Sequence, residues 1–169
     1  MYYIGDYIVK STNGVCEVKD IVNPDFVSNR NKIYYQLTPL SDQNAVLYIP
    51  VDKTDGVLRA VMTDQEAQEL IDKIPVIHET SVKSEKERER SYKAAVSSND
   101  PERVVGIMKL LHQRKKVRQE QGKKTTTVDE RYYGIAEKLL YSELELAMHK
   151  TREEINEQIR ESSELDENK

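Results

Sequence analysis

The chain has 169 residues but no tryptophan, a single cysteine, one phenylalanine and three histidines. A single cysteine excludes an intramolecular disulfide framework. Cys16 lies within an apolar strand pattern, which favours a buried structural thiol and makes a reducing, cytoplasmic location the expected one. No apolar run approaches the ~20 residues that a membrane-spanning helix needs. The N-terminus shows no basic segment followed by an apolar stretch, so we expect no signal peptide.

The patterns that carry catalytic or metal chemistry are also missing. There is no glycine-rich phosphate loop, no Cys/His ligand set and no His-Glu-x-x-His run. His78, His112 and His149 are scattered over three segments, and no partners for a catalytic triad can be named. In residues 85–90 the acidic residues alternate with Lys and Arg, which is typical of a solvated helix face. We therefore expect no enzyme activity, no bound metal and no cofactor.

Charge is distributed unevenly along the chain, although the formal net charge is only −4. Residues 1–75 hold seven Lys+Arg against eleven Asp+Glu, a balance of −4. Residues 103–131 hold nine Lys+Arg against three Asp+Glu, a balance of +6. Residues 150–169 hold four against seven, a balance of −3. This asymmetry indicates an acidic N-terminal block and a basic segment that is suited to an anionic partner.

The first sixty residues have the pattern of short β-strands. Residues 7–9, 33–37 and 45–51 are rich in β-forming residues, and residues 14–22 alternate apolar and polar for much of their length. The Asn-Pro-Asp of residues 23–25 is typical of a turn. A proline near the end of the fourth run indicates a strand end or a sheet edge. Four or five strands at this spacing predict a small barrel or a strongly bent sheet.

The remainder has the pattern of helices. A capping box in residues 63–66 opens a helix that should end before Pro75. A linker follows, and then a charged helix over residues 84–96. Asp100 is a good N-cap and Pro101 suits the first turn of a third helix.

Gly122 fits the C-terminus of that third helix. A second capping box, in residues 127–130, opens a fourth helix. The polar, acidic residues from about Thr151 are either a frayed helix or disordered.

Together these patterns predict an α+β chain in four segments. Residues 1–62 form a small β-barrel, and residues 63–83 form a capped helix and linker. Residues 84–150 form an all-helical domain that binds DNA, and residues 151–169 form the acidic tail.

The basic stripe at the end of the third helix has two interpretations. Cations in the last turn of a helix suit its dipole, so a solvated helix end is one interpretation. The other is a phosphate-binding corner, because further cations follow Gly122 and could face the same side across a tight connection. Four phosphate contacts would give a clear salt dependence on duplex DNA. The preferred phosphate contacts are Arg114, Lys115, Lys116, Arg118, Lys123, Lys124 and Arg131, with Arg88, Arg90 and Lys93 secondary.

Several motifs of the first sixty residues, taken in order, are distinctive together. The opening Ile-Gly-Asp-Tyr-Ile-Val of residues 4–9 is followed by Asn-Gly-Val at 13–15, then by Tyr-Tyr-Gln-Leu at 34–37 and by residues 48–52 and 55–59. This series resembles the CarD/CdnL transcription regulators, in which the last three correspond to the third strand and to the Val-Pro … Gly-Leu-Arg element. The N-terminal module of that family is shared with the RNA-polymerase-interacting domain of transcription–repair coupling factors. The resemblance extends over about residues 1–148.

The resemblance implies a Tudor-like β-barrel that docks on the β subunit of bacterial RNA polymerase, by strand-edge pairing plus side-chain anchors. It places Val22, Asn23, Tyr35 and Tyr48 near the polymerase-facing strands. The alternative for these four residues is ordinary barrel surface. The helical domain would then lie on promoter DNA at the upstream edge of the transcription bubble and stabilise the open complex.

The chain departs from the family at one position. Family members typically have a tryptophan near the start of the helical domain that wedges into the minor groove, and this chain has none. Ser81 lies close to that place, and serine cannot offset an unstacking cost of a few kcal/mol. Tyr92 is a possible substitute, although a tyrosine at that helical spacing is more often core. We therefore expect normal binding to polymerase and DNA but weak stabilisation of open complexes.

A second class of function remains open. The chain could be a protein-interaction module that binds polymerase or another partner without contacting DNA. The acidic net charge and the missing tryptophan favour it. A salt titration on duplex DNA separates the two classes, because protein-only binding predicts no salt slope.

Overall fold

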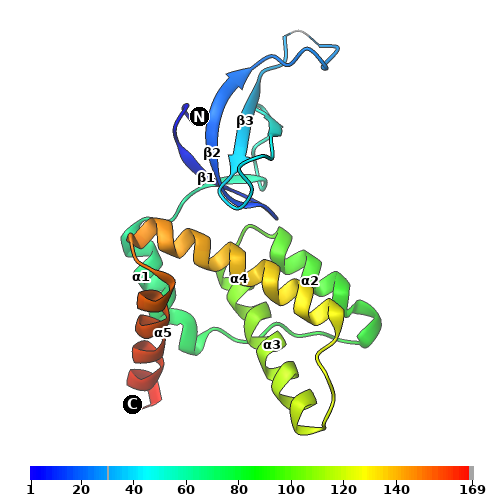
Figure 1. The fold of residues 1–169 in the computed structure, drawn as a ribbon, viewed down its shortest axis with the longest axis vertical. Helices are drawn as coiled ribbons and strands as arrows, with labels where there is room; N and C mark the ends of the chain where they lie inside the picture. Colours follow the sequence, from blue (N-terminus) through cyan, green and yellow to red (C-terminus); the bar gives the residue numbers. More distant parts are fainter. Residues whose placement is uncertain (30, 168–169) are drawn as a thin grey trace. The chain divides into compact units, whose positions relative to one another are not determined.

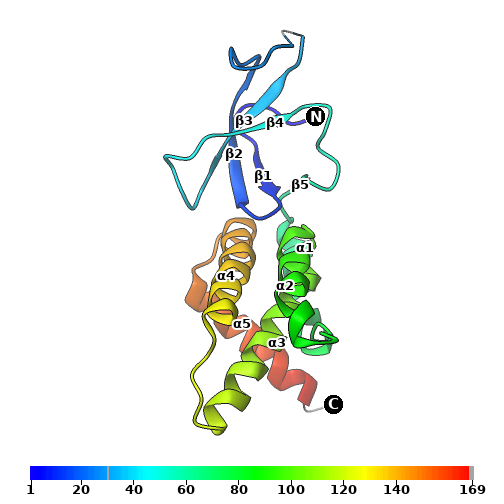
Figure 2. The same cartoon turned by 90° about the vertical axis from the view of Figure 1, so that its right-hand side faces the viewer.

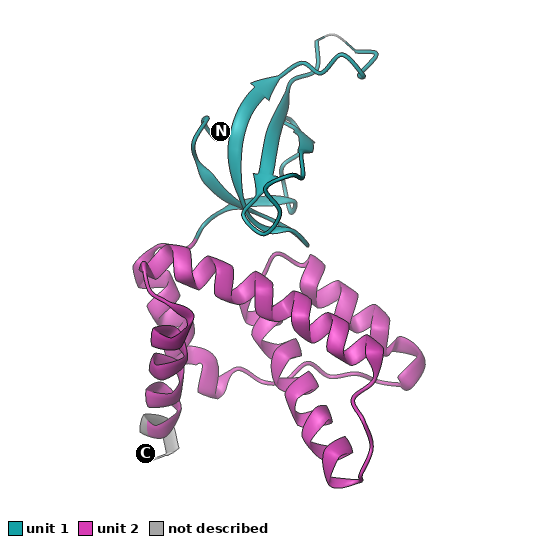
Figure 3. Ribbon diagram, viewed as in Figure 1, with its two compact units in different colours: residues 1–61 teal, residues 62–169 magenta. Residues whose placement is uncertain are grey.

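The computed structural model describes residues 1–29 and 31–167, and the chain divides into two compact units. Figure 3 shows unit 1, residues 1–61, in teal and unit 2, from residue 62 onward, in magenta. Each unit has its own hydrophobic core. Met62 belongs to the second unit, where its backbone N–H donates to the buried carboxylate of Glu143 over 2.9 Å.

Unit 1 is a curled antiparallel sheet with strand order β4-β3-β2-β1-β5 (Figures 1 and 2). The expected β-rich module is therefore confirmed. Because β4 and β5 are the two ends of this sheet and do not pair within the described residues, the barrel is open. The strands are β1 (Tyr7–Lys10), β2 (Gly14–Val22), β3 (Tyr34–Pro39), β4 (Leu47–Pro50) and β5 (Leu58–Ala60).

The core of unit 1 lies on the inner face of this sheet. Tyr35 and Leu37 on β3 face Ile21 and Val18 on β2, and all four pack into one cluster. Cys16 is also fully buried there, and burial raises the pKa of its thiol to about 11. The thiol is therefore protonated and unreactive at neutral pH, as the strand pattern predicted.

Unit 2 is entirely helical in its described part. Its core includes Ile71, Tyr92, Ile107 and Leu144, which come from four different helices. The elements are α1 (Asp64–Lys73), η1 (Ile74–Val76), η2 (Glu85–Glu87), α2 (Arg88–Ser97), α3 (Pro101–Glu120), α4 (Thr127–Met148) and α5 (Arg152–Glu167). The segment predicted as a capped helix and linker, residues 63–83, is part of this core rather than a separate connector, because α1 packs against α4 and α5.

Two of the predicted helix caps are confirmed, and a third is displaced by one residue. The Thr63–Glu66 capping box forms with both hydrogen bonds, at 2.8 and 3.1 Å. Asp100 caps α3 by accepting from the N–H of Glu102. The predicted box at 127–130 is wrong, because Thr126 caps α4 by accepting from the N–H of Asp129. Asp129, the N3 residue of α4, turns its side chain into the interior instead of back to the cap.

The acidic tail is helical up to residue 167. Thr151 begins it with a reciprocal cap, since its N–H donates to the Glu154 carboxylate and its hydroxyl accepts from the N–H of Glu154. Ile155 is fully buried in the core of unit 2. The tail is therefore a helix and not a disordered segment. Burial of an apolar residue anchors it to the core of unit 2, although its composition is mostly acidic.

The connection between η1 and η2 is held against α3 at a glycine. The N–H of Thr80 donates to the carbonyl of Gly106 over 3.1 Å. A Cβ added to Gly106 would lie 3.1 Å from both the His78 carbonyl oxygen and the Thr80 hydroxyl. Because Gly106 has no side chain, the connection can cross α3 at close range. This contact fixes the position of the neighbouring residue, Ser81, in the connection.

Candidate interaction surfaces

The outer face of the unit 1 sheet gathers apolar and aromatic side chains. Tyr34 pairs with Val22 on one side and with Pro50 on the other, while Tyr48 pairs with Gln36. These residues alternate with the core residues, so they face away from the core. The Phe26 ring packs edge-on against Tyr48 at 5.0 Å between centroids and is 68% exposed. We define the outer patch as Val22, Phe26, Tyr34 and Tyr48.

β4 borders this patch and lies at the end of the sheet. Its one ladder partner in the described part of the chain is β3. The backbone N–H and C=O groups on its far side are therefore open to a further strand. Pro50 ends this short strand, as its position in the sequence predicted.

Tyr35 does not belong to this surface, although it was predicted as a polymerase contact. Its side chain is 1% exposed, and its hydroxyl accepts a hydrogen bond from the N–H of Tyr2 at 3.0 Å. Adjacent residues on a strand face opposite sides, so Tyr34 occupies the outer position instead. Of the other predicted contacts, Asn23 is exposed, and Val22 and Tyr48 are partly exposed.

Six of the ten cations predicted to bind DNA are exposed, with no hydrogen bond or ion pair from their side chains to any described residue. The last turns of α3 and the α3–α4 connection carry four of them and α2 carries two. Figure 1 shows the end of α3 projecting away from α2 and α4. We call them the free cations: Arg90, Lys93, Lys115, Lys116, Lys123 and Lys124.

Two of the predicted arginines instead belong to a partly buried hydrogen-bond network that joins η2, α2, α3 and α4. Arg114 donates through Nε to Asp129 at 2.5 Å and through its terminal nitrogen to Glu85 at 3.1 Å. Tyr92 donates to the other oxygen of Asp129 at 2.9 Å, and Arg88 donates to the Tyr92 hydroxyl at 3.1 Å. The Asp129 side chain is only 3% exposed. This is the Arg114–Asp129 network.

The pKa directions agree with a structural role for these groups. Burial opposes the charge of Arg114, but the hydrogen bond and the charge of Asp129 outweigh it and raise the pKa of Arg114. Burial also raises the pKa of Tyr92, with Asp129 adding to the rise and Arg88 opposing it. The guanidinium groups of Arg114 and Arg88 already bind internal partners, which disfavours their predicted roles as phosphate contacts.

Arg118 and Arg131 are intermediate cases. Arg118 donates through Nε to the carbonyl of Lys124 at 2.8 Å, which fastens the α3–α4 connection. Arg131 pairs with Glu89 and lies over the Tyr132 ring, 5.0 Å from its centroid. Both partners of the Arg131–Glu89 pair are more than half exposed, so water and salt screen the pair strongly.

Ser81 lines a shallow groove of about 280 Å³ beside α2, together with Lys83, Arg90 and Ser91. No aromatic side chain lines this groove. Tyr92, the possible substitute for the missing tryptophan, is fully buried in the core. Its ring cannot reach a base step, so the suggestion that Tyr92 replaces the wedge is wrong.

Comparison with known families decides what the first unit is. Residues 2–62 match the model of the CarD-like/TRCF RID domain family. The chain carries a CarD-like/TRCF RID domain. Domains of this family interact with RNA polymerase and are not enzymes. The predicted resemblance is thus confirmed for residues 2–62, and a polymerase partner is supported at the level of the family. A search of curated proteins found no match to the chain.

The CarD-like domain accounts for the whole of unit 1, since the match and the compact unit share nearly the same boundary. The match ends where the helices begin, so the helical part of the resemblance stays a prediction. No group of three metal-ligating side chains occurs among residues 1–29 and 31–164, whose side chains the structure describes. Over the same residues, no helix is long and apolar enough to cross a membrane.

Two outer-patch residues of the CarD-like domain were not predicted from the sequence. Tyr34 was overlooked in favour of Tyr35, although the period of two allows only one of them to face outward. Phe26 follows the turn at residues 23–25 and carries no strand signal. Its identity as the only phenylalanine in the chain, placed in a polar loop, is the signal that could have found it.

Proposed function

We propose that the CarD-like domain docks on the β subunit of a bacterial RNA polymerase through the outer patch and the free edge of β4. The match of residues 2–62 to a polymerase-interacting family carries this proposal. From the predicted contacts we keep Val22, Asn23 and Tyr48, remove Tyr35, and add Phe26 and Tyr34.

The geometry suits a strand-addition mode of binding. An extended segment of the partner would pair with the open edge of β4, and the aromatic patch beside it would supply side-chain anchors. Aromatic side chains dominate the binding energy of many interfaces, and loss of one central anchor commonly costs 2 kcal/mol or more. Phe26 and Tyr48, which pack on each other, are the expected anchors.

A matched pair of variants of the full chain tests this docking surface. Tyr48→Ala should weaken binding to purified polymerase by roughly 30-fold, which corresponds to about 2 kcal/mol. Tyr3→Ala is the control, because Tyr3 is an equally aromatic, 68% exposed residue outside the sheet. Equal affinities of the two variants would remove the outer patch from the interface.

The proposed role of the helical unit is to contact promoter DNA near the upstream edge of the transcription bubble. The free cations support it, since six lysine and arginine side chains have no partner among the described residues and lie on α2, α3 and the α3–α4 connection. Contacts to phosphate would position the protein without reading sequence. Because the groove at Ser81 offers no apolar wedge, we propose that the protein modulates open-complex stability only weakly.

Introducing a tryptophan at Ser81 tests the proposal that the missing wedge residue limits open-complex stability. Ser81→Trp should lengthen the lifetime of open complexes on a promoter template, measured by challenge with a competitor. Thr80→Trp would be a poor control because Thr80 contacts Gly106, and Lys83 lines the same groove as Ser81, so Ser84→Trp, at an exposed residue outside the groove, serves as the control. If Ser81→Trp leaves the open-complex lifetime unchanged, the missing tryptophan does not explain weak stabilisation of open complexes, and this part of the proposal is wrong.

The alternative function, a polymerase-binding module that does not contact DNA, also has support. Four of the ten predicted phosphate contacts make internal hydrogen bonds or ion pairs, and the chain is acidic overall. A salt titration of duplex DNA binding distinguishes the two. A slope of log K against log salt of about −0.9 per contacted phosphate supports DNA contact, and no measurable binding at low salt supports the alternative.

A further inference from the structure

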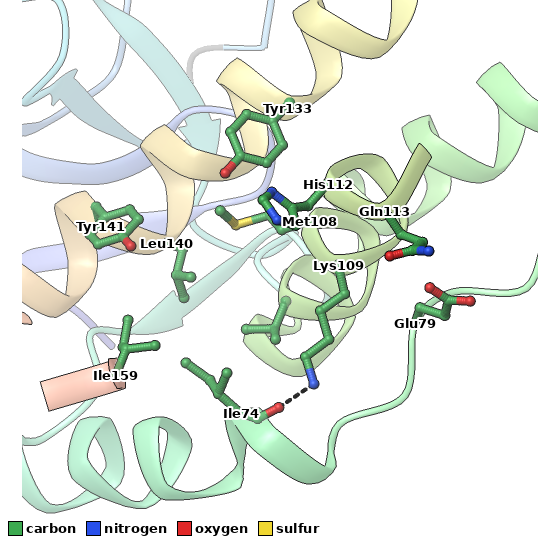
Figure 4. Close-up of a pocket in the computed structure, with 11 residues that line it drawn as sticks. Ile74, Glu79, Met108, Lys109, His112, Gln113, Tyr133, Leu140, Tyr141 and Ile159 are labelled. Atoms are coloured by element: carbon green, nitrogen blue, oxygen red, sulfur yellow. Dashed lines mark hydrogen bonds between the residues drawn. The ribbon is translucent and has the colours of Figure 1, made fainter. Parts of the chain in front are cut away.

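A cavity of about 380 Å³ lies within unit 2, between η1, the residues that follow it, α3, α4 and α5. Its size is within the range of small-molecule sites, about 300–1,000 Å³. Figure 4 shows an apolar side, with Leu140 and Ile159, and a polar side, with Glu79 and Gln113. Tyr133 and Tyr141, two turns apart on α4, flank the apolar side.

The cation inside this cavity is not available to a ligand. Lys109 donates to the backbone carbonyl oxygens of Ile74, of Pro75 at 3.3 Å and of Ile77 at 2.7 Å. An ammonium group has three protons to donate, so these three carbonyls use all of them. Lys109 therefore stabilises the end of η1 and offers no hydrogen bond to an incoming anion.

The carboxylate of Glu79 is the remaining full charge of the lining. Its side chain is exposed and forms no ion pair or hydrogen bond with the rest of the described chain. It is close enough to Lys109 to act on it, because it partly opposes the lowering of the Lys109 pKa by burial. The hydroxyl of Tyr133 also has no hydrogen-bond partner among the described residues, and burial raises its pKa.

We propose that this cavity binds a small amphipathic amine. The aromatic or aliphatic body of the ligand lies between Met108, Leu140 and Ile159, and its ammonium group faces the carboxylate of Glu79. The charge of Lys109 remains, but its three protons are already donated to backbone carbonyls, so an anionic ligand would gain no hydrogen bond from it and would face the Glu79 carboxylate. This site is independent of the proposed polymerase and DNA surfaces.

Three indole probes of similar shape test the proposal on the full chain. Tryptamine carries an ammonium group, ethylindole is neutral, and indolepropionate is an anion. Because the chain has no tryptophan, the indole fluorescence of each probe can be followed without a protein indole signal. We expect saturable binding of tryptamine, about twofold to fivefold tighter than ethylindole, which is the range for an exposed ion pair. Indolepropionate should bind more weakly than either.

Two variants locate the site and separate its two parts. Glu79→Gln should lower tryptamine binding to the level of ethylindole and leave ethylindole unchanged. Glu120→Gln, which removes an exposed carboxylate at the end of α3 outside the cavity, should change nothing. Ile159→Phe fills the apolar side and should weaken all three probes, with the helical circular dichroism spectrum checked for folding.

Several results would overturn the proposal. An absence of saturable binding by any probe would exclude a ligand site of this kind. Equal affinities of the three probes, or a tryptamine preference that survives Glu79→Gln, would exclude the amine as the ligand class. Binding that is unaffected by Ile159→Phe in a folded variant would place the probe elsewhere on the chain.

Discussion

Removal of the charge of Asp129 is the perturbation with the largest expected effect on the helical unit. Asp129→Asn keeps the shape of the side chain, but an amide cannot match two donors at once. If its oxygen keeps the hydrogen bond from Tyr92, its NH₂ group faces the Arg114 guanidinium, and two donors then oppose each other. The Arg114–Asp129 network would lose its one buried carboxylate.

The magnitude follows from how far each partner is buried. Breaking a buried ion pair by removing one partner costs about 3–5 kcal/mol. The Arg114 side chain is 20% exposed and keeps Glu85 as a partner, so we expect the lower end, roughly 3 kcal/mol. For a helical unit of roughly 100 residues this corresponds to a fall in Tm of about 12–24 °C.

Thermal unfolding of the full chain, followed by far-UV circular dichroism, measures this effect, because the helices all lie in unit 2 among the described residues. Glu89→Gln is the matched control. It breaks the Arg131–Glu89 pair, whose partners are both more than half exposed, and should cost less than about 1 kcal/mol. A Tm for Asp129→Asn no lower than that for Glu89→Gln would refute the reasoning that Asp129 anchors α4 to α2 and α3.

The remaining predictions concern two glycines, the thiol and the free cations. Gly106→Ala should destabilise the helical unit by about 1 kcal/mol in urea unfolding, because overpacking against the preceding connection costs about 1–3 kcal/mol and exceeds the gain in helix propensity. Gly134→Ala, whose added Cβ meets no atom within 4 Å, should instead stabilise the unit by roughly 0.5–1 kcal/mol. Burial raises the pKa of the Cys16 thiol from 9.0 to about 11. The protonated thiol therefore contributes fully to the free energy of unfolding below pH 9, and this contribution is lost as the pH rises toward 11. Cys16→Ala should reduce the loss of stability over this pH range. The double variant Lys115→Ala, Lys116→Ala should lose about two phosphate contacts. The slope of log K against log salt for duplex binding should become less steep by about 0.9 for each lost contact.

Each of these has an outcome that would count against it. Stabilisation by Gly106→Ala would show that the connection at residues 78–80 can move away at little cost. If Cys16→Ala and the unchanged chain lose stability equally between pH 9 and pH 11, another group causes that loss. An unchanged salt slope for the double lysine variant would remove the end of α3 from the DNA contact surface.

The sequence was sufficient to predict the fold in outline, because strand alternation and helix caps are local signals. Thr63 and Asp100 cap their helices as predicted, and Cys16 lies in the core. The Thr151 cap was detectable by the same rule but was obscured by the acidic composition around it. Ile155 and Ile159 form an i,i+4 apolar pair that packs on the core of unit 2, but two such residues in a polar helix are a weak periodic signal.

The candidate sites were less predictable, because charge in a sequence does not tell whether it has a partner. Arg114 and Lys115 are neighbours in the same basic run, yet one binds Asp129 inside the unit and the other is exposed. The partner lies fifteen residues away on another helix, so only the tertiary structure separates the two. The same applies to Tyr34 and Tyr35, since the register with β2 and β4 decides which of them faces outward.

Docking of the CarD-like domain on polymerase is the central claim, and hydrogen–deuterium exchange tests it most directly. Exchange of the full chain would be compared with and without the purified polymerase β-subunit lobes. We predict protection concentrated in β4 and in the segment around Phe26 and Tyr34, with the opposite edge strand, β5, unchanged. Protection confined to β5, or an absence of protection anywhere in residues 2–62 while the chain is bound, would contradict the proposed docking surface.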